Sequence, residues 1–384
     1  MIKSILKGIF PRTFLKEVFL ILNKLKINSW DKFFFPEKFI ATEVFLAKEE
    51  INPFLSNKVI TSGLSKEAQK KLGIWLDQEW NQDQYFLHYK DPAFLEPKSG
   101  WAITSDHRLI YPSLGFSRAP HVHKPNWVES YIHKGSVVDI PRIISLRDTG
   151  EENYFHFFND VLSKLFYIQD QSFDLTNFTI VVSEKLFKKE YFQFFYQKTW
   201  LKELTWHVQS KEWIAFKEAI FCKPYTHSRK YLDRAVDLVR PKLITNKTRK
   251  IFLTRSKNSL RFIENMDEVK PLLELYQFEI VDSGDIKISR QIELFSECRY
   301  LISVHGAGIT NIIFRQGNPL SLLEIVQPSS YIPFHYVMLA HQYEYSYDVL
   351  LGEIGKHRNQ GGFRINYDLL KVSLENMLKP SNHE

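Results

Sequence analysis

The sequence has only two cysteines in 384 residues, Cys222 and Cys298, and they lie far apart in the chain. This count argues against a disulfide scaffold and a cysteine-rich zinc site, and it fits a reducing compartment. A Gly-x-Gly-x-x-Gly turn, a Walker A motif, an Asp-x-Asp pair and a His/Cys metal spacing are also missing. Their absence disfavours a dinucleotide oxidoreductase, a P-loop ATPase and a metal-dependent transferase of the Asp-x-Asp type.

Long runs of lysine and arginine are absent as well, which argues against nucleic acid as a partner. The net charge of +7 still favours an anionic partner, such as a phosphorylated substrate or a lipid surface. Aromatic residues are abundant, with 31 Phe and 18 Tyr, and they suit a core, sugar-ring stacking or a membrane interface equally well. Composition therefore points to an anion-binding globular protein without deciding its ligand.

The first 30 residues contain most of the excess positive charge. Six lysines or arginines and one glutamate lie in this segment, a side-chain charge of six minus one, or +5. Apolar residues recur at helical spacing on both sides of Pro11. The longest apolar run of the segment, 18–22, is far shorter than the about 20 residues that span a bilayer. Two interpretations stay open: an amphipathic helix pair on an anionic membrane surface, or a helix docked on the protein itself.

Beyond this segment, strand and helix patterns alternate, which is the signal of a parallel α/β sheet. The pattern predicts two domains, 31–245 and 246–384, separated by a polar, basic stretch at 245–250. In the first domain we expect helices at 38–48, 65–81, 184–199 and 228–239, and strands at 136–147 (where Pro141 indicates a sheet edge or a bend), 178–183, 204–208 and 219–223.

The second domain shows the cleaner alternation and ends in a helix. We expect strands at 251–254, 278–281, 300–304, 320–326 and 345–350, with helices at 266–276, 289–297, 333–341 and from residue 310. This is the pattern of a doubly wound sheet, which binds its ligands at the carboxyl ends of its strands.

A glycine turn follows the predicted strand at 300–304 and leads into a helix start. Free backbone N–H groups and the helix dipole at such a point attract an anion, and glycines let the backbone approach it closely. The alternative is a turn that only packs the strand against the helix. The predicted ligand-binding residues of this turn are His305, Gly306, Ala307, Gly308, Thr310 and Asn311.

Other candidate ligand-binding residues follow neighbouring strands of the same domain. Arg255 and Arg261 come after the first strand and can hold a diphosphate through their forked donors, with Asn265 close behind in sequence. Glu324, at the end of the fourth strand, can accept two ribose hydroxyls; the alternative is a salt-bridged surface acid. Together with the glycine turn, these positions predict a pocket for a nucleotide diphosphate.

A third feature is the helix that carries His156 and Asp160 within a cluster of phenylalanines. The two residues are four apart and therefore share one helix face. Apolar surroundings there can raise the proton affinity of a carboxylate or orient an imidazole for proton transfer. The alternative is a helix start where an acid is tolerated by the dipole beside a surface histidine.

These segments resemble glycosyltransferase family 61, which includes bacterial capsular polysaccharide enzymes. The resemblance rests on NYFHFFNDVL at 153–162, TRS at 254–256, FEIV at 278–281 and HGAGITNIIF at 305–314, and it covers about residues 140–350. This chain has Phe157 where the family often has Trp, Ser163-Lys164 where it often has Pro-Arg, and Met266 where it usually has Glu.

The resemblance implies a GT-B-like fold of two facing Rossmann-like α/β domains and inverting, metal-independent sugar transfer from a nucleotide sugar. The donor serves as substrate, so no cofactor is implied. The acceptor would be a hydroxyl of a growing surface glycan or a lipid-linked glycan, and the enzyme would be cytoplasmic and peripheral on the inner face of the membrane. Asp160, or His156 oriented by Asp160, would be the general base.

Two other functions stay open from the sequence. One is a non-catalytic, membrane-docked subunit that binds a nucleotide sugar within a polysaccharide assembly machine. The other is a transferase of a phosphosugar or a polyol phosphate.

Overall fold

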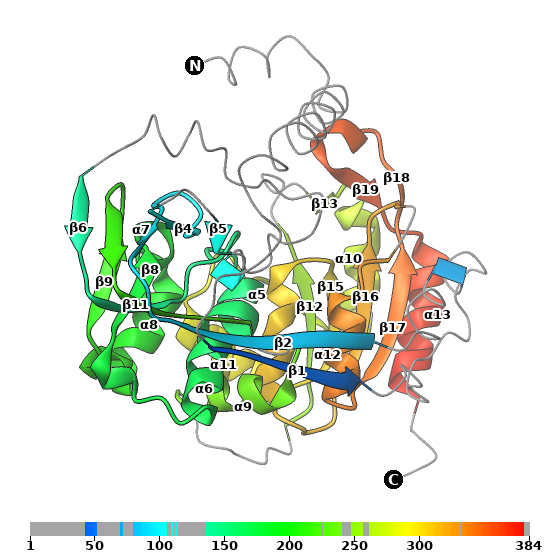
Figure 1. The fold of residues 1–384 in the computed structure, drawn as a ribbon. Helices are drawn as coiled ribbons and strands as arrows, with labels where there is room; N and C mark the ends of the chain where they lie inside the picture. Colours follow the sequence, from blue (N-terminus) through cyan, green and yellow to red (C-terminus); the bar gives the residue numbers. More distant parts are fainter. Residues whose placement is uncertain are drawn as a thin grey trace.

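The computed structural model describes residues 43–51, 70–71, 80–105, 109–110, 112–113, 136–223, 226–239, 247–255, 261–329 and 332–379. Within these residues the chain forms a mixed α/β protein with four sheets (Figure 1). The predicted N-terminal amphipathic segment, the domain boundary at 245 and most of the helix expected at 65–81 lie outside the described residues.

The first large sheet has the strand order β1-β2-β11-β7-β8-β9. β11, β7, β8 and β9 run parallel, and β2 and β1 extend the edge as an antiparallel pair. The parallel strands are mostly buried, as expected for a sheet covered on both faces. Their bounds are β1 (Glu43–Ile51), β2 (Trp80–Tyr89), β7 (Arg142–Ser145), β8 (Thr179–Ser183), β9 (Trp206–Gln209) and β11 (Glu218–Lys223).

The helix expected at 38–48 is wrong, because residues Glu43–Ile51 form β1. β1 pairs with β2 along its whole length, from Glu43 opposite His88 to Ile51 opposite Trp80. Such long pairing satisfies the backbone of a segment whose local preference for a helix is weak, and tertiary pairing overrides propensity in that situation.

Two smaller sheets flank the large ones. Of the two alternatives for Pro141, an edge or a bend, the structure shows a bend: β6 before it pairs with β10, whereas β7 after it pairs with β11, so the chain changes sheets there. The small sheets consist of β3 (Ala93–Leu95), β4 (Ala102–Thr104), β5 (Leu109–Ile110), β6 (Val137–Asp139) and β10 (Trp213–Phe216), and of β13 (Phe262–Ile263), β18 (Glu353–Ile354) and β19 (Gly362–Arg364).

The second large sheet is entirely parallel, with the order β14-β12-β15-β16-β17. Numbered along this half of the chain, the order is 2-1-3-4-5, a doubly wound arrangement whose switch point lies between the first and third strands. That point is the carboxyl edge of β12 and β15. The strands are β12 (Arg249–Thr254), β14 (Glu279–Asp282), β15 (Cys298–Val304), β16 (Ser321–Val326) and β17 (Ser346–Leu351).

Helices cover both faces of this sheet, and alternate strand residues point to each face. Ile251 and Leu301 pack into the largest hydrophobic core, which also contains residues of the first half, whereas Phe252 and Ile302 pack into a second core under α10 and α13. Figure 1 shows the green strands of the first large sheet and the yellow and orange strands of the second in the two halves of the molecule. The rings of Phe158 and Phe314, one from each half, lie 5.9 Å apart.

Two helical segments differ from an ordinary α-helix. The one that follows the glycine turn, expected as a helix from residue 310, is a nine-residue 3-10 helix, η5 (Ala307–Arg315). The one that carries Asp160 is a π-helix, η2 (Phe157–Leu162). Runs of 3-10 helix this long are uncommon, and π-helices occur frequently at functional sites.

The helix expected at 184–199 is divided into α7 (Glu184–Phe187) and α8 (Glu190–Lys198). The other expected helices are confirmed with ends that differ by a few residues: α9 (Arg229–Asp237), α10 (Met266–Leu275), α11 (Ile288–Ser296), α12 (His335–Gln342) and the C-terminal α13 (Tyr367–Leu378). The helical segment of His156 and Asp160 begins as α5 (Tyr154–His156) and continues after η2 as α6 (Ser163–Asp170), and short 3-10 turns occur at η3 (Leu175–Asn177), η4 (Trp200–Glu203) and η6 (Arg358–Gln360).

Candidate functional site

The candidate site lies where the carboxyl ends of the two parallel sheets approach each other. In the first sheet the chain runs from β7 through β8 to β9 and returns to β11 on the other side of β7, so its switch point lies between β7 and β11. Asp148 follows β7, and His227 follows β11. In the second sheet, Arg255 follows β12 and His305 follows β15 at the corresponding point.

Direct contacts join these two edges. The hydroxyl of Tyr154 donates to Oδ1 of Asn311 at 2.7 Å, and Nδ2 of Asn311 donates to Oε1 of Gln291 at 2.9 Å. The ring of Phe155 lies 5.2 Å from the ring of His335 at the start of α12. The structure therefore brings the segment 153–162 and the glycine turn, which are about 145 residues apart in sequence, to one place.

His156 and Asp160 form a direct pair. Nδ1 of His156 lies 2.5 Å from Oδ2 of Asp160, and Nδ2 of Asn159 donates to Oδ1 of the same carboxylate at 2.9 Å. Their side chains are 19% and 11% exposed, so neither is a solvated surface group. Nδ1 of the imidazole is bonded to the carboxylate, and Nε2 lies on the side of Gly150.

The two groups shift each other's proton affinity. Burial lowers the pKa of His156, but the hydrogen bond and charge of Asp160 outweigh burial and raise the pKa above its ordinary value of 6.5. Burial likewise raises the pKa of Asp160, and the bond to His156, with the charges of His156 and Lys164, brings the pKa below 3.8. The pair is therefore an ion pair over a window of moderately acid pH.

This pair gives a pH dependence of stability with a defined sign. Asp160, with its lowered pKa, stabilises the fold above pH 3.8, and that contribution is lost as pH falls through the folded value. His156, with its raised pKa, stabilises it below pH 6.5, and that contribution is lost as pH rises through the folded value. Urea unfolding of the protein and of Asp160→Asn should differ most in free energy between these two pH values. If the difference in free energy of unfolding between the two proteins instead grows steadily from neutral to alkaline pH, the ion pair is contradicted.

The loop between β7 and α5 is fixed by buried charges. Nζ of Lys164 lies 3.0 Å from Oδ2 of Asp148, and Nε of Arg147 lies 2.9 Å from Oε1 of Glu151. The same loop contains Gly150, where an added Cβ would lie 3.5 Å from Cδ2 of His156. The ammonium of Lys164 holds the loop that faces His156, through Asp148 and the backbone oxygen of Arg147.

Lys164→Met is expected to destabilise the fold by about 3–5 kcal/mol, because it leaves the carboxylate of Asp148 buried without its cation. Both side chains of this pair are 3% exposed. The matched control is Lys188→Met, which breaks an ion pair with Glu184 whose side chains are 70% and 43% exposed. The control should lower the free energy of unfolding, measured with urea, by at most about 1 kcal/mol. Equal losses in the two variants would contradict the structural role of the buried pair.

The glycine turn packs directly against an arginine. A Cβ added at Gly306 would lie 2.0 Å from Nη2 of Arg255, so only glycine leaves room for that guanidinium. Nη1 of Arg261 donates to the backbone oxygen of His305 at 2.9 Å. Burial, and then the charge of Arg261, lowers the pKa of Arg255. Two guanidinium groups therefore converge beside the start of η5, where the first N–H groups have no acceptor within the helix. This corner has the chemistry of an anion site.

Two predicted ligand-binding residues have their polar atoms engaged inside the protein. Glu324 is 0% exposed, and its carboxylate bonds Nδ1 of His305 and accepts from the hydroxyl of Tyr347 at 2.8 Å. Asn265 is bonded through its amide to both backbone groups of Ile365. Glu324 is thus neither a surface acid nor placed for a ribose: it orients His305. Asn265 anchors the strand β19.

The remaining residues of the turn are close to the anion site but contribute in different ways. Gly308 packs against Leu253: a Cβ added at Gly308 would lie 2.9 Å from Cδ2 of Leu253. Thr310 is buried near Tyr336, and Asn311 links the two halves through Tyr154. Ala307 begins η5. The structure therefore brings Arg255 and Arg261 to the glycine turn and joins Asn311 to Tyr154, next to His156 in the sequence. Glu324 bonds His305 of the turn from inside the protein, and Asn265 bonds Ile365.

Sequence reasoning missed two histidines of the site, His227 and His335. His335 begins α12, and Nδ1 of His335 lies 3.4 Å from Nε2 of His227. Each is isolated in the sequence and belongs to no motif, so only the fold reveals that they meet. Among the described residues, no group of three or more His, Cys, Asp or Glu side chains could hold a metal ion.

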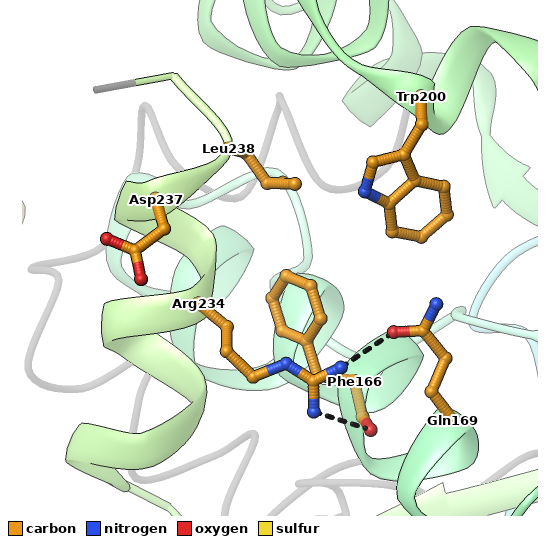
Figure 2. Close-up of a pocket in the computed structure, with 6 residues that line it drawn as sticks. All are labelled: Phe166, Gln169, Trp200, Arg234, Asp237 and Leu238. Carbon is orange, nitrogen blue, oxygen red and sulfur yellow. Dashed lines mark hydrogen bonds between the residues drawn. The ribbon is translucent and has the colours of Figure 1, made fainter. Parts of the chain in front are cut away.

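A separate pocket of about 230 Å³ lies away from these residues (Figure 2). Arg234 crosses it, donating from Nη1 to the backbone oxygen of Phe166 at 3.3 Å and from Nη2 to Oε1 of Gln169 at 2.8 Å. None of the predicted site residues lines it. The full lining is Phe166, Gln169, Trp200, Arg234, Asp237 and Leu238.

Parallel α/β sheets with two guanidinium groups at one switch point and a His–Asp pair at the other are an arrangement that can bind a phosphorylated ligand beside a proton-transfer group. Residues 154–321 match the family model described as Glycosyltransferase 61, and this part of the chain is a glycosyltransferase family 61 domain. The resemblance inferred from the sequence is thereby confirmed. A comparison with curated proteins finds no match to the chain.

A domain of this family implies a transferase that moves a sugar from a donor to an acceptor. In the part of the chain that the structure describes, no helix is long and apolar enough to cross a membrane.

Proposed function

We propose that the protein is an inverting, metal-independent hexosyl- or pentosyltransferase that moves a sugar from a nucleotide sugar to a hydroxyl of a growing surface glycan, such as a capsule. One observation carries the proposal: the arginine-lined glycine turn and the His156–Asp160 pair lie on facing strand ends, joined by the bond from Tyr154 to Asn311. A donor diphosphate and an acceptor hydroxyl need these two groups at one site.

The fold that we propose is GT-B-like, with a Rossmann-like domain on each side of the site. The support is the 2-1-3-4-5 strand order of the second sheet and the parallel strands β11, β7, β8 and β9 of the first, each with a switch point at the site. The second sheet would hold the donor, and the first would hold the acceptor.

In the proposed mechanism, the acceptor oxygen attacks the anomeric carbon as the bond from that carbon to the diphosphate oxygen breaks. The acceptor proton passes to Nε2 of His156, whose other nitrogen is held by Asp160. Arg255, Arg261 and the first amides of η5 stabilise the charge that grows on the leaving diphosphate. The base must be neutral to accept a proton, so the rate should rise with pH through the raised pKa of His156.

The test is incubation of the full chain with a panel of UDP-, GDP- and dTDP-sugars, with detection of the released nucleotide. Release of a nucleoside diphosphate with inversion at the anomeric carbon supports the proposal. Release of a nucleoside monophosphate would indicate the rival transfer of a phosphosugar or polyol phosphate. Binding of a nucleotide sugar without turnover of any acceptor would favour the non-catalytic assembly subunit.

We further propose that the protein works in the cytoplasm, peripheral on the inner face of the membrane, with a glycan or lipid-linked glycan as acceptor. The support is the charge of +5 and the amphipathic spacing in residues 1–30. Sedimentation with anionic liposomes tests this: deletion of residues 1–30 should abolish it, and persistence after deletion would refute it.

A further inference from the structure

A pair of histidines spans the site between the two halves of the chain. His335 opens α12 in the second half, and His227 follows β11 in the first. Their rings lie 5.5 Å apart at an interplanar angle of 24°, with Nδ1 of His335 3.4 Å from Nε2 of His227. Neither residue has a role in the mechanism above.

His227 is held firmly in an unusual backbone conformation. Its φ is 60°, a value that non-glycine residues rarely adopt and that persists only where the surroundings fix it. Its backbone N–H donates to Oδ1 of Asn159 at 2.6 Å, and Nδ2 of Asn159 donates to Asp160. One asparagine therefore fixes both the carboxylate of the proton-transfer pair and the histidine beside it.

The contacts of the two rings form a directional chain. Nδ1 of His227 lies 3.0 Å from the hydroxyl oxygen of Thr226, and its Nε2 faces Nδ1 of His335. Burial, followed by the charge of a neighbouring histidine, lowers the pKa of His227 to about 3 and that of His335 to about 4. Both rings are therefore neutral near pH 7. Because a neutral imidazole has one donor and one acceptor nitrogen, the tautomer of His227 dictates whether Nε2 of His335 donates or accepts.

His335 is near both parts of the candidate site. Three titratable side chains act on it electrostatically: His156 and Asp160 of the proton-transfer pair, and His305 of the glycine turn. The rings of Phe155 and Phe334 lie 5.2 Å and 4.3 Å from it. A neutral hydrogen-bonding edge among aromatic rings suits a sugar, which combines hydroxyl groups with apolar C–H faces.

We infer that His335 hydrogen-bonds a hydroxyl of the transferred sugar and that His227 is a positioning residue that sets the tautomer of His335. The inference rests on the proposed function and extends it by assigning the sugar subsite. The diphosphate lies against Arg255 and the glycine turn, the acceptor lies against His156, and the sugar ring lies between them against the His227–His335 pair.

The test separates the sugar from the nucleotide. Calorimetric binding is measured for the nucleotide sugar that the panel identifies and for the nucleoside diphosphate of the same base. His335→Ala should weaken binding of the nucleotide sugar about tenfold, the effect of one lost hydrogen bond, and leave binding of the diphosphate unchanged. His335→Gln, whose amide reaches the position of Nε2, should restore most of the loss. His341→Ala, on the same helix α12, should change neither affinity.

A second measurement keeps the inference testable if a variant folds poorly. In the unaltered protein labelled with ¹³C at the ring carbons of histidine, NMR should show two rings that remain neutral between pH 5 and pH 8. One of these signals should shift on addition of the nucleotide sugar and stay in place on addition of the diphosphate.

The following results would overturn the assignment. These are an equal loss of both ligands in His335→Ala, no difference between the alanine and glutamine variants, or a charged His335 ring at pH 7. If the wild-type protein binds the diphosphate and transfers the sugar, and His335→Ala keeps full affinity for the nucleotide sugar, only the sugar subsite is refuted. A wild-type protein that binds no nucleotide sugar refutes the proposed function as well.

Discussion

Asp160→Asn is expected to reduce the turnover of sugar transfer about 10²–10⁴-fold, the range for removal of a general acid–base group. The asparagine keeps the size of the side chain but cannot hold the proton on Nδ1 of His156 as an ionised carboxylate does, 2.5 Å away. Affinity for the nucleoside diphosphate should change little, because the anion site is on the other sheet. Steady-state kinetics with saturating donor and calorimetry with the diphosphate measure the two quantities.

The matched control is Asp170→Asn on the following helix α6, where the carboxylate pairs with Lys230 and Arg234 near the surface. This control should retain normal turnover. A fully active Asp160→Asn would show that neither His156 nor Asp160 is the base. A loss of diphosphate affinity equal to the loss of rate would indicate that the residue supports the fold of the site instead.

Arg255→Ala is expected to weaken nucleoside diphosphate binding about 10- to 150-fold, the effect of losing hydrogen bonds between a cation and a phosphate. The rate at saturating donor should fall as well, because the same guanidinium would stabilise the leaving diphosphate. Arg364→Ala is the control: its guanidinium pairs with Glu268 away from the glycine turn and should leave the affinity unchanged.

Gly306→Ala provides an independent variant of the same site. The new Cβ would lie 2.0 Å from Nη2 of Arg255 and would displace that side chain, and Gly306 has φ 158° and ψ 176°, a backbone region that glycine alone adopts readily. Diphosphate affinity should therefore fall toward that of Arg255→Ala, and the urea midpoint should fall as well because the alanine strains the backbone. Gly284→Ala, where the nearest atom is 3.3 Å from the added Cβ, should leave the diphosphate affinity unchanged. Normal diphosphate binding by both Arg255→Ala and Gly306→Ala would place the anion site elsewhere.

The second half of the chain was the more predictable from sequence. Its strands are buried, β-branched and separated by short helices, and the structure confirms all five predicted strands of its sheet within a few residues. There the local pattern and the tertiary structure favour the same elements. At Glu43–Ile51 they conflict, and the pairing of β1 with β2 prevails over the expected helix.

The site was predictable only in part, for a physical reason. His156 with Asp160, and Arg255 with the glycine turn, are close to strand ends, so topology alone places them at the carboxyl edge. Side-chain direction is not fixed by topology: Glu324 points into the protein towards His305 and Tyr347. The sequence does not indicate that His227 and His335 belong to the site, because their contact depends on how the two halves pack.

The bond from Tyr154 to Asn311 has a consequence for how the site operates. It lies close to the contact between Phe158 and Phe314, in a hydrophobic core that both halves share. Separating the halves would expose that core to water at about 25 cal/mol per Å² of apolar surface. The spacing between the anion site and the His156–Asp160 pair is therefore preorganised, and it does not have to be assembled by closure of the two halves when substrates bind.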